Sequence, residues 1–278
     1  MTLPDPPRRL AIAQMAMAWT TADNTRGVLQ QLGLAAQAGA ALVVFPELAI
    51  TGFHREIRRE AQPAPVAAAL VQVAAACAQH RIAAAVGAPA WIPGEPRPLN
   101  VHVLIDAHGQ VQAQVAKIGL TPSEATFFAP GTAPRPVATL AGWRCSSVLC
   151  REVEDDQALA AQLPPGRADL LLWPSLVGHD PALMAAHGWP DYLPLARAVA
   201  RHSTAWLVQC NWPWALNTPE SRHAGESAVI GPDGQLRLRL PRDAAGLAVF
   251  DLGDTRLDWL PQAEACHPGD SPPARPPA

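Results

Sequence analysis

Residues 41–53 read ALVVFPELAITGF, a short apolar run that ends at a proline and a glutamate. The five apolar residues at 41–45 fit a buried strand. Pro46 has no backbone N–H and disfavours continuation of that strand. Glu47 is therefore expected at a strand exit, where α/β sheets bind their ligands. Taken alone, however, this glutamate is more simply explained as a solvated loop residue.

Strand-like and helix-like segments alternate on both sides of this run. The predicted strands cover residues 10–17, 41–45, 82–87, 100–105, 111–117, 143–150, 170–173, 205–210, 227–230, 236–240 and, as the last one, 245–252. The predicted helices cover residues 23–38, 66–79 and 192–202. Asp23 is the expected cap of the first helix, and Gly39 suits its left-handed end. This alternation predicts an α/β fold in which helices are layered over sheet.

The chain is expected to form a single domain over residues 10–267. Residues 1–9 are read as an N-terminal extension, and the proline-rich residues 268–278 as a tail that is disordered or lies along the surface. A short apolar stretch follows two arginines near the N-terminus, but Gln14 interrupts it. We therefore interpret it as the first strand and not as a signal peptide.

The composition excludes several classes of function. The net charge is −3, from 21 basic and 24 acidic side chains, so no strongly basic surface is available for nucleic acid. Hydrophobic residues make up 49% and charged residues 16%, which excludes disorder for most of the chain. No run of ~18 apolar residues occurs, so a membrane span is not expected. The five scattered cysteines form no C-x-x-C pair, which argues against a disulfide framework or a zinc ribbon and predicts a cytoplasmic location.

Two more segments place a reactive side chain at the end of an apolar strand. In QVAKIGLTPSEATFFAPG (114–131), Lys117 ends a strand-like run and Glu124 follows in a loop. A lysine among apolar neighbours could act as an electrostatic catalyst, although a surface lysine is the simpler explanation. In GWRCSSVLCREVEDD (142–156), Cys150 ends a strand at a turn into a helix. Backbone N–H groups there could favour a thiolate, or Cys150 could equally be an inert buried thiol.

In combination, these segments resemble the motifs of the nitrilase superfamily, also called the carbon–nitrogen hydrolases, whose members carry a Glu-Lys-Cys triad in this order. The matching motif residues are Phe45, Pro46, Glu47, Thr51, Gly52 and Phe53; Lys117, Leu120, Glu124, Phe128, Pro130 and Gly131; and Cys150 and Glu152. The resemblance extends over roughly residues 10–252, where further matches are Gln14, Asn24, Asn100, residues 168–175, Arg197, Ala198, Asn211, Gly225, Ser227 and residues 232–234.

The resemblance implies a four-layer α-β-β-α sandwich in one domain, and subunits that pair through a helical face into a homodimer or larger assembly. It also implies hydrolysis of an amide or carbamoyl C–N bond of a small molecule, without a metal or an organic cofactor. Cys150 would be the nucleophile, Glu47 the general base and Lys117 the stabiliser of the tetrahedral anion. Glu124 would help to position the substrate and the lysine. Nitrile hydrolysis by the same triad is the alternative.

The chain departs from the family around the cysteine. Arg151 stands where the family commonly has an aromatic residue, VEDDQ replaces the family's F-P-E, and Ala200 replaces a glutamate. These departures leave open a catalytically decayed member that acts as an interaction domain. Arg151 could bind a substrate carboxylate, or it could pair with Glu154 or Asp155. The candidate substrate-binding residues are Phe53, Arg151 and Ser175.

The histidines that follow Cys150 suggest two rival sites. A Cys–His thiol hydrolase would use His179, His187 or His202, but none of them lies in a recognisable motif. His179, Asp180 and His187 could also be read as metal ligands. The separation of eight residues between the two histidines fits no common metal site, so no metal is expected.

Overall fold

The computed structural model describes residues 9–178, 181–188, 190–217 and 224–262, which contain two β-sheets. The strands of the first sheet are β1 (Arg9–Gln14), β2 (Leu42–Val44), β3 (Ala83–Ala90), β4 (Leu99–Ile105), β5 (Val111–Ala116), β12 (Gly246–Asp251) and β13 (Leu257–Pro261). The strands of the second sheet are β6 (Ala138–Leu140), β7 (Trp143–Ser147), β8 (Leu170–Ser175), β9 (Trp206–Asn211), β10 (Ala228–Ile230) and β11 (Leu236–Arg239).

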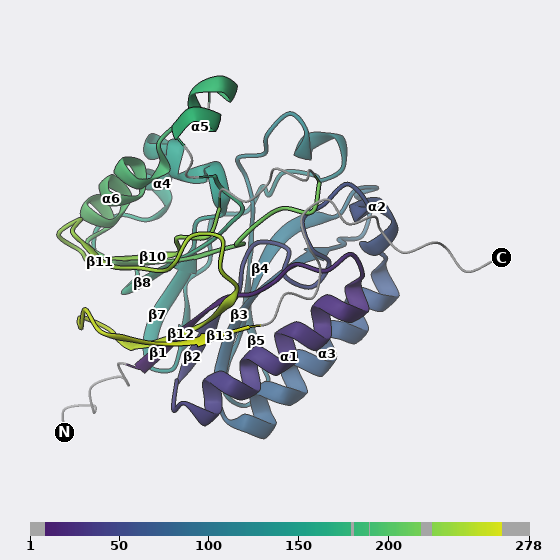
Figure 1. The fold of residues 1–278 in the computed structure, drawn as a ribbon. Helices are drawn as coiled ribbons and strands as arrows, with labels where there is room; N and C mark the ends of the chain where they lie inside the picture. The colour runs from purple at the N-terminus through teal and green to yellow at the C-terminus, as the bar shows by residue number, and fades with distance from the viewer. Residues whose placement is uncertain (1–8, 179–180, 189, 218–223, 263–278) are drawn as a thin grey trace.

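The helices lie outside the sheets, so the molecule has four layers (Figure 1). The helical elements are α1 (Thr21–Gln37), α2 (Ile57–Glu60), α3 (Pro63–His80), α4 (Asp156–Gln162), α5 (Pro181–His187), α6 (Tyr192–Ser203) and the 3₁₀ turns η1 (Glu124–Thr126) and η2 (Cys150–Glu154). Helices α1 and α3 cover the first sheet, and α4 and α6 cover the second (Figure 1). The predicted α-β-β-α sandwich is confirmed.

Both sheets are mixed. The strand order of the first is β13-β12-β1-β2-β3-β4-β5, and that of the second is β11-β10-β9-β8-β7-β6. Strands β1, β2 and β3 run parallel to one another, as do β7, β8 and β9, and the outer strands are antiparallel. The parallel strands of both sheets are buried on both faces, which explains their nearly continuous apolar sequences.

Alternation along the strands divides the interior into separate cores. In β1, Ala11 and Ala13 face the layer of α1 and α3, whereas Leu10 and Ile12 face the second sheet. The same division holds in β8, where Leu170 and Leu172 point between the sheets and Leu171 and Trp173 point toward α6. The fold is therefore held by one core between the sheets and one beneath each helical layer.

Several details of the predicted elements were wrong. The first strand ends at Gln14 and not at residue 17, and β6, α2, α4 and α5 were not predicted. Thr20, and not Asp23, caps α1: the Thr20 hydroxyl accepts the backbone N–H of Asp23 at 3.1 Å. The strand expected at 143–150 ends at Ser147, so Cys150 lies three residues beyond β7 in the turn η2. The strand at 245–252 is not the last, because β13 follows it and pairs antiparallel with β12. The sequence LDWLP of β13 is short, is interrupted by Asp258 and is partly exposed, so it does not form a continuous buried apolar run.

The predicted extension and tail fall largely outside the described residues. Residues 1–8 and 263–278 are not described, so their assignments stay predictions. None of the helices in the described ranges has both the length and the apolar composition that a bilayer crossing requires. The predicted left-handed residue after α1 is confirmed, because Gly39 has a φ of 78°.

Candidate active site

Glu47 lies three residues beyond β2, on a turn that packs directly against β3. Gly87 makes this close approach possible, since a Cβ atom there would lie 2.3 Å from the backbone nitrogen of Leu48 and 2.5 Å from the carbonyl oxygen of Pro46. The indole N–H of Trp212 donates to the carbonyl of Glu47 at 2.8 Å. These contacts hold a glutamate whose exposed fraction is 0%.

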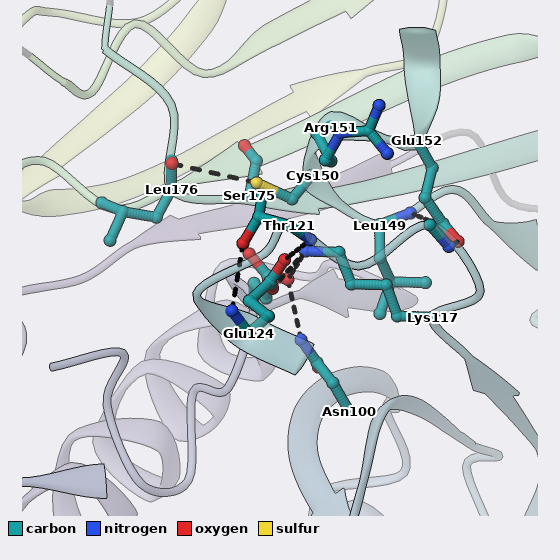
Figure 2. A network of polar contacts seen from close by, with 12 residues as sticks. Asn100, Lys117, Thr121, Glu124, Leu149, Cys150, Arg151, Glu152, Ser175 and Leu176 are labelled. Atoms are coloured by element: carbon teal, nitrogen blue, oxygen red, sulfur yellow. Dashed lines mark hydrogen bonds and ion pairs between the residues drawn. The ribbon is translucent and has the colours of Figure 1, made fainter. Parts of the chain in front are cut away.

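Lys117 follows the last residue of β5, and its ammonium joins two carboxylates. Its Nζ donates to Oε1 of Glu47 at 2.7 Å and to Oε1 of Glu124 at 2.5 Å (Figure 2). The side-chain N–H of Asn100, on β4, also donates to Oε1 of Glu47, at 2.8 Å. Glu124 is itself fixed, because its Oε2 accepts the backbone N–H of Thr121 at 2.8 Å. The structure thus brings together three of the predicted site residues in a buried cluster.

Burial and charge set the protonation states of this cluster. Burial alone would lower the pKa of Lys117, but the neighbouring Glu47, Cys150 and Glu124 outweigh burial and raise it, so this group is an ammonium. Burial raises the pKa of Glu47 above its usual range, although Lys117 opposes that change. Oε2 of Glu47 is buried and has no hydrogen-bond partner among the described residues. That oxygen is available to accept a proton.

Cys150 opens the turn η2 in a left-handed conformation, with a φ of 50°. The indole N–H of Trp173 donates to its carbonyl at 2.8 Å, which helps to fix the turn. Its Sγ lies 3.8 Å from the carbonyl oxygen of Leu176 (Figure 2). Figure 2 shows the sulfur on the side of the turn that faces Lys117 and Thr121.

The sulfur interacts electrostatically with the same cluster. Burial raises the pKa of the Cys150 thiol, the charge of Glu47 raises it further, and the charge of Lys117 opposes both. The balance leaves a neutral thiol at rest. A thiol of this kind needs a base to take its proton when it attacks, and Glu47 is close enough to influence its ionisation.

Glu152 connects the lysine segment to the cysteine turn. Its Oε1 accepts the backbone N–H groups of Ile118 at 2.6 Å and Gly119 at 3.0 Å, and its Oε2 accepts that of Leu149 at 2.7 Å. Arg135 completes the arrangement with an ion pair to Oε1 at 2.6 Å. Glu152 therefore ties the residues that follow Lys117 to the residue that precedes Cys150.

A cavity of about 630 Å³ opens beside Cys150. Phe53 and Arg151, two of the three predicted substrate-binding residues, line it, as does Glu124. Ser175 is fully buried and does not line it. The Ser175 hydroxyl is instead bonded to Asn211 at 3.1 Å, so its assignment to the substrate stays a prediction that the geometry does not favour.

Arg151 is already paired. Its guanidinium lies 3.3 Å from Glu154 and 3.4 Å from Asp155, which is the second of the two arrangements considered from the sequence. The rival histidines receive no support: His202 is exposed on α6 and lines a separate cavity. His179 and Asp180 lie outside the described residues, and the His187 side chain is not described.

Arg135 is the residue of this region that the sequence did not reveal. It follows the lysine motif by several residues, in a stretch rich in proline, and no spacing marks it as buried. Its side chain is nevertheless only 3% exposed, because its guanidinium forms an ion pair with the buried Glu152. Asn100 and Glu152, in contrast, were found as motif residues, and the structure adds what each of them binds.

Comparison with known proteins identifies a matching family and similar structures. The family model described as carbon-nitrogen hydrolase matches residues 9–257. A mutant of the amidase from Nesterenkonia sp. AN1, with an acetamide moiety covalently added at its active-site cysteine, is 26% identical to this chain with a TM-score of 0.73, over 91% of this chain and 93% of that one. A mutant of that amidase in complex with butyramide is 26% identical, with a TM-score of 0.73 over 91% and 94%. No curated relative matches this sequence.

A third structure adds the classification of that enzyme. It is a mutant of the Nesterenkonia AN1 amidase, described as from the nitrilase superfamily, and is 25% identical to this chain with a TM-score of 0.74 over 91% and 94%. The similarity extends over nearly the full length of both chains, and the residues that the family model matches include Glu47, Lys117 and Cys150.

Proposed function

The chain belongs to the carbon–nitrogen hydrolase family of the nitrilase superfamily, and from that membership we propose that Glu47, Lys117 and Cys150 hydrolyse an amide or carbamoyl C–N bond of a small molecule. The protein is an amidase-like carbon–nitrogen hydrolase. The observation that carries the proposal is the fully buried Lys117 ammonium, bonded at 2.7 Å to Glu47 and electrostatically coupled to Cys150.

Acylation is the first half of the proposed reaction. The Cys150 sulfur attacks the carbonyl carbon while Oε2 of Glu47 takes the thiol proton. The Lys117 ammonium stabilises the negative charge that develops on the carbonyl oxygen, and no water competes with it in this buried position. The C–N bond then breaks, Glu47 returns the proton to the nitrogen, and ammonia or an amine leaves a thioester on Cys150.

Deacylation uses the same residues again. Water attacks the thioester carbon, and Glu47 accepts a proton from it. Lys117 stabilises the second tetrahedral anion as it did the first. Collapse of that anion expels the sulfur, which regains a proton, and releases the acid. Glu124 keeps the ammonium in position through the 2.5 Å contact. The scheme needs no metal or organic cofactor.

Release of ammonia from a panel of amides, carbamoyl compounds and nitriles tests the proposal. We expect turnover of amides or carbamoyl compounds, and an acyl adduct on Cys150 in the mass spectrum of the quenched enzyme. Cys150→Ala should abolish both. Cys77→Ala is the matched control, since Cys77 is a buried thiol on α3 and should be dispensable.

Two outcomes would decide against this function. Nitrile turnover without amide turnover would assign the alternative reaction to the same triad. If no compound is turned over and iodoacetamide labels Cys150 no faster than Cys77, the protein is a decayed member that acts as an interaction domain. Homodimer formation and a cytoplasmic location are proposed only from the sequence.

A further inference from the structure

Two arginines in the wall of the active-site cavity form no ion pair with any carboxylate that the structure describes. Arg55 lies just before α2 and Arg58 lies within it. Both line the cavity that contains Cys150. Within the described ranges, the ion pairs of this segment all involve their neighbour Arg59, which binds Glu56 and Glu60. In the described part of the chain, the positive charges of Arg55 and Arg58 are therefore not compensated by an ion pair.

The other charges that line the cavity are already compensated. Arg151 is paired with Glu154 and Asp155, and Glu124 is paired with Lys117. The wall formed by Arg55 and Arg58 is consequently the part of the cavity with an excess of charge, and that charge is positive. An anionic group that enters the cavity would be attracted to this wall.

Both guanidiniums are held in place by aromatic rings and carbonyl groups. Arg55 lies 4.6 Å from the centre of the Trp19 ring and donates to the carbonyl of Asn217 at 3.2 Å. Arg58 lies 5.2 Å from the centre of the Phe127 ring and donates to the carbonyl of Thr126 at 2.9 Å. Each guanidinium has five N–H donors, so most of them remain for a ligand. A planar, preorganised guanidinium suits bidentate binding of a carboxylate.

We propose that the substrate is an amide or carbamoyl compound with a carboxylate at its far end, which Arg55 and Arg58 bind while the C–N bond lies at Cys150. This inference rests on the proposed function and adds the substrate class. Apolar residues also line the cavity, among them Phe53 and Leu176, and they would contact the carbon chain that separates the two groups. Arg151 lies in the same cavity but has its own acidic partners, so it is not the main carboxylate ligand.

Steady-state kinetics with matched compounds test this substrate class. The probes are the monoamides of four- to six-carbon dicarboxylic acids, each compared with the diamide of the same acid, which has the same length but no charge. For the best chain length we expect a lower KM for the anionic monoamide. In Arg55→Gln/Arg58→Gln, its KM should rise about 10- to 100-fold, while the KM of the diamide changes little.

The controls separate charge from folding. Arg26→Gln removes the same charge from an arginine on α1, outside the cavity, and should leave both KM values unchanged. Arg55→Lys/Arg58→Lys keeps the charge but loses the bidentate geometry, so it should recover part of the preference. The preference should also weaken as the salt concentration rises. Thermal denaturation of each variant shows whether it has folded.

Binding to the inactive Cys150→Ala protein gives a readout that does not need turnover. Calorimetry should show tighter binding of the monoamide than of the diamide, with the difference lost when Arg55 and Arg58 are replaced. Equal affinities in the unmodified cavity would overturn the inference even if amides are hydrolysed. Turnover of neutral amides without any anion preference would leave the proposed function standing and refute this substrate class alone.

Discussion

Glu47 binds the Lys117 ammonium and Glu152 binds the backbone just after Lys117, and both carboxylates are fully buried with a cationic partner. The two carboxylates differ in how completely they are bonded. Both oxygens of Glu152 accept hydrogen bonds, three of them from backbone N–H groups. Glu47 receives its bonds on Oε1, and its Oε2 has no partner among the described residues.

Under the proposed function, this difference separates a structural carboxylate from a reactive one. A buried polar atom without a partner is costly, so proteins retain it where chemistry needs it. The bonds of Glu152 hold two segments together, and each of its oxygens is engaged by at least one donor. Glu47 is anchored by one oxygen and keeps the other for a proton. The experiments below test this division of roles.

The largest effect is expected from Glu47→Gln. The amide keeps the size of the side chain and can accept from Lys117, but it cannot take a proton. We expect kcat/KM for amides to fall ~100- to 10,000-fold, with little change in the midpoint of thermal unfolding. Ammonia release and calorimetric scanning measure the two quantities. A variant with more than a tenth of the original rate would show that Glu47 is not the base.

Glu152→Gln should affect stability more than chemistry. The substitution leaves the Arg135 guanidinium buried without a counter-charge, and we expect it to lower the free energy of unfolding by ~3–5 kcal/mol. Urea denaturation measures the loss. Glu152→Gln/Arg135→Met removes both charges and should recover part of the stability. A cost below ~1 kcal/mol for the single variant would contradict the structural role of Glu152.

Acid should lower the free energy of unfolding through His102, which lies near the pair of Glu152 and Arg135. This buried histidine lies on β4 and its Nδ1 is 2.7 Å from the hydroxyl of Ser147, whose carbonyl accepts from Arg135. Burial lowers the pKa of His102 from 6.5 to about 4. Between pH 6.5 and pH 4, His102 is protonated in the unfolded chain but stays neutral in the folded chain. The free energy of unfolding therefore decreases as the pH falls from 6.5 toward 4.

The expected loss from His102 is about 3 kcal/mol at pH 4. Urea denaturation at neutral and acid pH measures it, with His102→Gln as the comparison because glutamine does not titrate. The variant should be less sensitive to acid than the original protein. Equal losses in the two proteins would mean that His102 does not govern the acid response.

The smallest effect concerns the pH profile of activity. Glu47 must be a carboxylate to accept the thiol proton, and its pKa is raised by burial. The acid limb of kcat/KM should therefore lie at a higher pH than the pKa of an exposed glutamate. Glu152→Gln should leave this limb in place, even if the variant is less active. If substitution of Glu152 shifts the acid limb of kcat/KM and substitution of Glu47 does not, the roles assigned to the two carboxylates would be reversed.

The apolar runs predicted the buried strands well where they were long, and they failed at strand ends and at short, partly exposed elements. The runs at 41–45 and 170–173 reappear in β2 and β8, which are buried on both faces. Strand β13 is short and partly exposed, and Asp258 interrupts its apolar residues. The end of β7 was misplaced because Val148 and Leu149 continue the apolar run into the turn before Cys150.

The site was predictable to the extent that its residues occur in motifs. Glu47, Lys117 and Glu124 were expected together, and the structure joins them through the Lys117 ammonium. The motifs did not indicate the pairing of Arg135 with Glu152 or the uncompensated charge at α2. Both depend on which side chains meet after folding, and a single sequence contains no periodic signal for such contacts.

The position of the cluster between the sheets has a consequence for assembly of the protein. Glu47 and Lys117 follow strands of the first sheet, whereas Cys150 follows a strand of the second. The sulfur acquires its neighbouring acid and ammonium only when the two sheets close on each other. In a half-folded chain the Cys150 thiol would lack the base and the ammonium that activate it in the proposed reaction. The appearance of fast thiol acylation during refolding would therefore report when the two sheets pack together.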